Sequence, residues 1–115
     1  MHLDPIISRR FKELQTKGEA VRSAKLLDFT SNEGVPHYKF RSGPYKEWAT
    51  NVLSLLQRTF GETSVHYKHF AALYESFSGW ESGFEESFGV FQAAKEDHEG
   101  GYHFHIRTLA KAEVL

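Results

Sequence analysis

Segment 44–60 alternates hydrophobic and polar residues with the period of an amphipathic helix. Its polar positions recur every three or four residues and leave one wide apolar face. The apolar positions are Trp48, Ala49, Val52, Leu53, Leu55, Leu56 and Phe60. A face this wide has to be covered by other helices, so the segment predicts a helical core. Pro44 is expected in the first turn, and Gly61 is expected to end the helix with a left-handed cap.

The N-terminal segment predicts a helix from Pro5 to about residue 25. Asp4 has a typical N-cap side chain, and proline suits the first helical position. Apolar residues then follow on one face of this helix, and Gly18 interrupts their stripe because it has no side chain. Residues 26–43 lack the period of a helix, because turn residues are followed there by alternating aromatic and polar positions. They predict one short strand or an ordered loop, since a two-stranded ribbon alone would be marginal.

Two more helices are predicted in the second half of the chain. The third starts at an N-cap of Thr63 or Ser64 and runs to about Phe77, and the fourth ends at the two glycines of residues 100–101. Segment 102–115 predicts the start of a short fifth helix. We therefore expect a single all-α domain of four to five helices in an up-and-down array, with segment 26–43 irregular. The apolar end of the chain predicts either a piece of a longer protein or a tail that docks.

Composition excludes several classes of chemistry. The 115 residues contain no cysteine, so disulfides, thiol nucleophiles and thiolate metal sites are excluded. No apolar run approaches the roughly 20 residues of a membrane span, and the N-terminal residues lack the charged-then-apolar layout of a signal peptide. Phosphate-binding glycine loops and serine-nucleophile motifs do not occur. We therefore predict a cytoplasmic protein that is not an enzyme, has no cofactor and does not contact membranes.

Charge is distributed unevenly although the net charge is only −1. Residues 1–25 carry six Lys or Arg against three acids, whereas residues 75–99 carry seven acids against one Lys. One interpretation is that these two helices are neighbours, within the chain or across a dimer. The alternative is a nucleic-acid-binding domain that uses the basic first helix. Its contact residues would be Arg9, Arg10, Lys12 and Arg22.

The histidines are the best candidate metal ligands in this sequence. His103 and His105 form an HxH pair with His98 upstream, a spacing that can present imidazoles to zinc or nickel. Such a site also needs a converging carboxylate, Asp97 or Glu99, which spacing alone does not supply. We therefore predict that His103 and His105 face solvent on either side of a buried Phe104 and that no metal binds.

A second pair, His66 and His69, occupies adjacent turns of the third predicted helix. The HExxH pattern of a metalloprotease does not occur there, because Tyr67 and Lys68 follow His66. We predict that His66 caps the apolar face or bonds a backbone carbonyl.

The fourth predicted helix carries an aromatic stripe that has two interpretations. Its members are Trp80, Phe84, Phe88 and Phe91. At helical spacing such a stripe packs in a core, or it forms an interaction surface where four helices do not cover it. Under the interface interpretation, a charged residue at position 88 yields a soluble monomer. Loss of folding would instead identify a core position.

The middle of the chain resembles a segment near the N-terminus of uncharacterised bacterial proteins. The matching form is a tryptophan-containing helix, an RxFGExS junction and an aromatic helix. It is represented here by Trp48, Leu55, Leu56, Arg58, Phe60, Gly61, Glu62, Ser64, Tyr67 and Phe70. The resemblance covers residues 44–115 and implies a C-terminal domain of the HEPN class (higher-eukaryote-and-prokaryote nucleotide-binding), which is defence-associated in some relatives.

The same resemblance implies no activity for this N-terminal part. A HEPN ribonuclease would need an arginine followed by four to six residues and a histidine on one helix, whereas Arg58 and His66 are farther apart and Gly61 lies between them. We therefore expect a non-catalytic interaction or oligomerisation module. Its partner would be a second copy or a C-terminal domain of the same parent chain.

Overall fold

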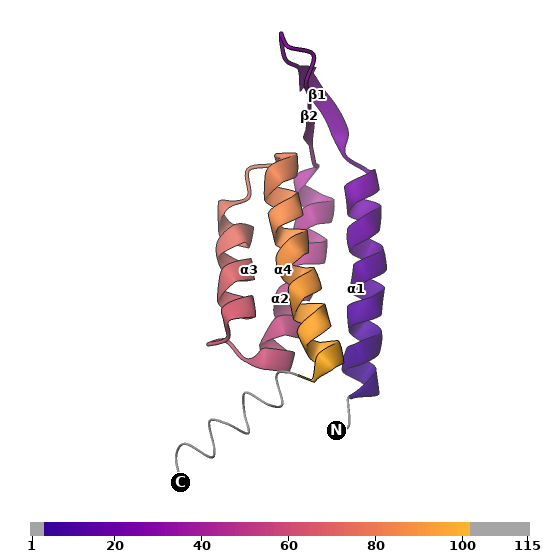
Figure 1. Cartoon of the computed structure of the whole chain (residues 1–115), viewed down its shortest axis with the longest axis vertical. Coiled ribbons are helices and arrows are strands. Elements are labelled where there is room, and N and C mark those ends of the chain that lie inside the picture. Colours follow the sequence, from indigo (N-terminus) through magenta and orange to yellow (C-terminus); the bar gives the residue numbers. More distant parts are fainter. Residues whose placement is uncertain (1–3, 102–115) are drawn as a thin grey trace.

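A computed structural model of the chain describes residues 4–101, which form four helices and two strands. The elements are α1 (Pro5–Ser23), β1 (Leu26–Thr30), β2 (Pro36–Lys39), α2 (Ser42–Phe60), α3 (Val65–Ser76) and α4 (Glu81–Gly100). Successive helices run in opposite directions, and α4 packs against both α3 and α1 (Figure 1). The mainly helical prediction is confirmed for this part of the chain. The predicted fifth helix lies outside the described residues.

Short polar side chains set two of the helix starts as the sequence predicts. The Asp4 carboxylate accepts hydrogen bonds from the backbone N–H groups of Ile6 and Ile7, and Pro5 follows it at the first position of α1. Ser64 Oγ accepts a bond of 3.1 Å from the backbone N–H of Tyr67. These N-terminal amides have no partner inside the helix, so the caps define where α1 and α3 begin.

Two predicted helix ends need correction. Gly61 does end α2 at positive φ, but its ψ of 160° lies outside the left-handed helical region. Trp80 is the N-cap of α4 and lies before the helix, with an extended backbone at φ −75° and ψ 152°. Its ring therefore does not continue the stripe of the helical aromatic residues.

Residues 26–39 form an antiparallel hairpin, where the sequence predicts one strand or a loop. Leu27 pairs with Tyr38, and Phe29 pairs with His37, with a β-bulge at Asp28 between the two pairs. The base of the hairpin is anchored to the helices, because the Phe40 backbone N–H donates to the carbonyl of Gly79 at 2.8 Å. This added pairing supports a ribbon that would be marginal in isolation. We call residues 26–39 the hairpin arm; it projects from the end of the bundle where α1 meets α2 (Figure 1).

The core surrounds Trp48, which is 2% exposed. Rings from α3 and α4 pack around its indole with centroid distances of 5.5–5.8 Å: Phe70, Phe84, Phe88 and Phe91. The indole Nε1–H donates a hydrogen bond of 2.9 Å to the backbone carbonyl of Leu14 in α1. All four helices therefore meet at one side chain, and the wide apolar face predicted for segment 44–60 is covered.

At Gly18, α1 lies directly against two rings of the core. A Cβ added there would lie 2.5 Å from Phe88 Cε2 and 2.9 Å from Trp48 Nε1. The glycine that weakens the apolar stripe of the first helix thus makes room for two rings. Within residues 4–101, no helix combines the length and apolarity needed to cross a membrane.

Candidate interaction surfaces

The aromatic stripe of α4 is core, which makes the interface interpretation of three of its members wrong. Phe84, Phe88 and Phe91 are each 0% exposed, because α1, α2 and α3 close around α4. Trp80 differs from them because it is only partly buried. Its ring meets Phe29 edge-on at 6.0 Å, and Lys39 Nζ lies 4.4 Å from its centroid. Trp80 thus belongs to the base of the hairpin arm.

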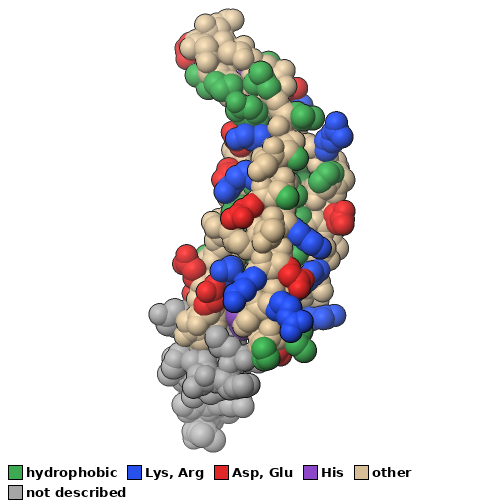
Figure 2. All heavy atoms as spheres, turned by 90° about the vertical axis from the view of Figure 1, so that its right-hand side faces the viewer, with side chains coloured by type: hydrophobic (Ala, Val, Ile, Leu, Met, Phe, Trp, Pro, Cys, Tyr) green, Lys and Arg blue, Asp and Glu red, His purple; other side chains and the backbone are tan. Residues whose placement is uncertain are grey.

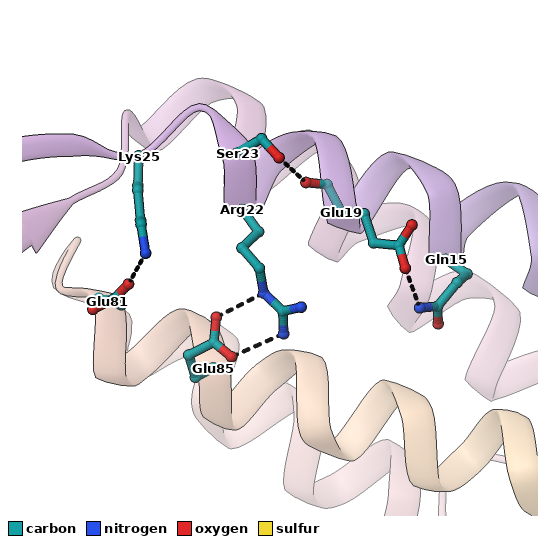
Figure 3. A network of polar contacts seen from close by, with 7 residues as sticks. All are labelled: Gln15, Glu19, Arg22, Ser23, Lys25, Glu81 and Glu85. Atoms are coloured by element: carbon teal, nitrogen blue, oxygen red, sulfur yellow. Dashed lines mark hydrogen bonds and ion pairs between the residues drawn. The ribbon is translucent and has the colours of Figure 1, made fainter.

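The basic first helix packs beside the acidic fourth helix within one chain, as one interpretation of the charge pattern predicts. The Arg22 guanidinium donates from Nε and Nη2 to the Glu85 carboxylate at 2.9 and 2.8 Å (Figure 3). Lys25 pairs with Glu81 one turn earlier on α4, and this hydrogen bond raises the pKa of the Lys25 ammonium group. Pairs of charges exposed to this extent contribute little to the free energy of unfolding.

Two of the four candidate nucleic-acid residues make ion pairs within the chain. Arg22 is held by Glu85, and Arg10 pairs with Glu13 on its own helix at 3.1 Å. Arg9 and Lys12 are exposed. Nucleic-acid binding remains a prediction, which a salt titration tests: duplex DNA should give a slope of about −0.9 per phosphate contact. A flat salt dependence would remove this alternative.

His98 is buried at the end of the bundle where α1 begins and α4 ends. It is 1% exposed, its Nε2 forms a hydrogen bond of 2.9 Å with Ser8 Oγ, and its ring stacks on Phe11 at 5.0 Å. As a candidate metal ligand His98 is therefore enclosed by the helices instead of open to solvent. The other candidate ligands, His103 and His105, lie outside the described residues. Within residues 4–101, no three His, Cys, Asp or Glu side chains converge as a metal site would require.

The stability of the domain should fall as pH drops below about 6.5, because burial lowers the pKa of His98 from its ordinary value of 6.5. The nearby carboxylates of Glu99 and Asp4 oppose this shift but are outweighed. Below pH 6.5 the unfolded chain binds a proton that the folded His98 resists, so stability is complete above this pH and declines beneath it. Urea midpoints between pH 7 and 5 should show this decline. His98→Gln should flatten it, and equal slopes in the two proteins would contradict the assignment.

His66 bonds a side chain instead of a backbone carbonyl. Its Nε2 lies 2.6 Å from Asp97 Oδ2 of α4, and its ring packs 4.9 Å from that of Phe60. This residue therefore joins α3 to α4 and covers the apolar end of α2, in line with the structural role predicted for it. His69 is exposed.

The hairpin arm carries most of the exposed large apolar side chains. Among residues 4–101, six large apolar side chains are exposed, and four of these six belong to the arm. They are Leu26 (49% exposed), Leu27 (59%), Phe29 (47%) and Val35 (49%). Figure 2 shows apolar side chains gathered at the projecting end of the molecule. The sequence signal for this surface is an apolar pair, residues 26–27, at the start of a segment rich in turn residues.

The strand register distributes these side chains over both faces of the arm. Directly paired residues share a face, so Leu27 lies with Tyr38 on one face and Phe29 with His37 on the other. The Phe29 and His37 rings stack at 4.4 Å. Single exposed apolar residues need no explanation, so the feature that distinguishes the arm is the number of them on one hairpin, over both of its faces.

Comparisons of this chain with protein-family models, with curated proteins and with solved structures find no match.

Proposed function

We propose that this chain is a non-catalytic protein-interaction domain that self-associates through its hairpin arm. The observation that carries the proposal is the concentration of four exposed apolar side chains on an arm that projects from the helices. The helical core holds the arm in place through the Phe40–Gly79 hydrogen bond and the Lys39–Trp80 contact. A positioned apolar arm loses less conformational freedom on binding than a flexible loop does.

A second copy of the chain suits this surface because the arm and its base carry charges of both signs. Asp28 and Glu33 lie on the arm, and Lys39 and Arg41 lie on it or next to it. In a two-fold contact the same patch meets itself, so each acid of one copy can face a base of the other. The β-bulge at Asp28 interrupts the β1 edge, so we expect packing of side-chain faces instead of a continuous intermolecular sheet.

Light scattering over a range of protein concentrations tests self-association. The mass of the wild-type protein should rise from monomer to dimer, and Leu27→Lys with Val35→Lys should hold it at the monomer. Both side chains are about half exposed and lie outside the helical core, so the helical circular dichroism should be unchanged.

Val65→Lys is the matched control for this experiment. Val65 is 79% exposed on α3, away from the arm, so the substitution places the same charge on an apolar surface position. It should leave the monomer–dimer equilibrium unchanged. A wild-type protein that stays monomeric at high concentration, or a control that dissociates as the arm variant does, would contradict the proposal.

The sequence resemblance adds a proposed context: an accessory domain of a cytoplasmic bacterial protein, followed by a HEPN-like domain and belonging to a defence or regulatory system. Four of its matching residues lie in the core, namely Trp48, Leu55, Leu56 and Phe70. The motif therefore describes how the helices pack. The full coding sequence of the parent gene tests this proposed context. If the encoded protein has no helix with the HEPN-type arginine–histidine spacing, the proposed context is wrong.

A further inference from the structure

A groove runs between the first half of α1 and the last half of α2, at the end of the bundle away from the hairpin arm. Two adjoining cavities of about 260 and 270 Å³ form it and share Arg10, Leu55 and Arg58 in their linings. Asn51 and Ser54 line the first cavity as well. Lys and Arg side chains gather near this end of the face shown in Figure 2. The first cavity is thus lined by four polar side chains and one apolar side chain, that of Leu55.

The groove has an excess of positive charge. Arg9, Arg10 and Arg58 line it against one carboxylate, Glu13, which gives a local formal charge of +2. Arg58 makes no ion pair with any residue that the structure describes. Arg10 pairs with Glu13, but these side chains are 35% and 48% exposed, so a bound anion can compete for the guanidinium group.

We propose that this groove binds a small phosphate-bearing ligand, with Arg10 and Arg58 contacting the phosphate from two helices. Guanidinium groups match phosphate oxygens in pairs and keep their charge at all physiological pH values. A phosphate monoester carries close to two negative charges at pH 7, which balances the groove, whereas a carboxylate carries one. Ser54 and Asn51 offer further hydrogen-bond donors, and Leu55 provides an apolar surface for the rest of the ligand.

The charge pattern favours a small ligand over a nucleic acid. The exposed arginines of the groove are confined to one end of the α1–α2 face, and Arg22 is tied to Glu85 on the α4 side. A polymer would need a longer basic track with several phosphate contacts. The inference does not depend on self-association, since the groove and the arm lie at opposite ends of the bundle.

Backbone-amide NMR at constant ionic strength tests the site with inorganic phosphate, adenosine monophosphate, acetate and a short single-stranded oligonucleotide. Phosphate and the monophosphate should shift the amides of Ser54 and Arg58 with saturation. Arg58→Ala should weaken the affinity for phosphate and for adenosine monophosphate at least tenfold. Acetate should cause no saturable shift in the wild-type protein. Absence of saturable phosphate shifts, or equal binding of acetate, would overturn the proposal.

Lys68→Ala is the matched control. Lys68 is an exposed cation on α3 that lines neither cavity of the groove and lies outside the hairpin arm. The substitution should leave phosphate affinity unchanged. If the control variant weakens phosphate binding as much as Arg58→Ala does, general charge attraction explains the shifts, and the assignment of the site to Arg10 and Arg58 is wrong. An oligonucleotide that binds far more tightly than the monophosphate, with a steep salt dependence, would also overturn the proposal.

Discussion

Replacing Phe88 with glutamate should abolish the folded domain instead of releasing a soluble monomer. The Phe88 ring is 0% exposed and packs on Trp48, with ring centroids 5.8 Å apart, while Arg22 covers it at 4.3 Å. Truncating a buried phenylalanine costs about 3–5 kcal/mol, and placing a carboxylate in the same site adds a desolvation penalty. The sum approaches the about 5–15 kcal/mol stability of a typical domain. Far-UV circular dichroism and thermal melting should show a largely unfolded chain.

Two further variants separate the burial of Phe88 from a general sensitivity of α4. Gln92→Glu adds the same charge at an exposed position one turn later and should leave the melting temperature nearly unchanged. Phe88→Leu should fold with reduced stability, because it keeps an apolar side chain but leaves space among the rings. A folded Phe88→Glu protein with a lower solution mass than the wild type would restore the interface interpretation of the stripe.

Local sequence predicted the helices well because their determinants lie within a few residues. Asp4 before Pro5 and Ser64 before α3 satisfy amides that each helix itself leaves unpaired. The apolar face of segment 44–60 could likewise be read from its own period. Each of these features depends on contacts between neighbours in the chain, so an isolated segment contains the information.

The aromatic stripe could not be assigned because its environment comes from distant segments. Phe91 is covered partly by Phe11 of α1 and partly by Trp48 of α2. A helical period shows that side chains share a face, but it does not show which helix covers that face. Trp80 added to the difficulty, since its spacing continues the stripe although its backbone is extended.

The candidate surfaces were missed for the same reason. Arg10 and Arg58 come together only because α1 and α2 pack side by side, and their charges look unrelated along the sequence. On the hairpin arm, the bulge at Asp28 determines which side chains share a face, and a bulge cannot be read from the alternation of residue types. Sequence patterning therefore predicted the core elements, whereas the surfaces depend on packing and strand register.

Replacing Gly18 with alanine should destabilise the domain by about 2 kcal/mol, although alanine is the better helix former. Intrinsic propensity favours the substitution by about 1 kcal/mol. The added Cβ, however, would lie 2.5 Å from Phe88 and 2.9 Å from Trp48, and both rings are enclosed by other core side chains. Overpacking of this kind costs about 1–3 kcal/mol, and moving the indole also weakens its hydrogen bond to Leu14. Urea denaturation followed by circular dichroism measures the change.

Gly89→Ala is the control that isolates packing from propensity. Gly89 lies inside α4, is exposed, and has no atom within 4 Å of the position that a Cβ would take. The same chemical change should therefore stabilise the domain by up to about 1 kcal/mol there. The two glycine substitutions are expected to have opposite signs because one helix meets a neighbour at its glycine and the other meets solvent. A stabilising effect at both positions would mean that α1 does not approach Trp48 and Phe88 as closely as described.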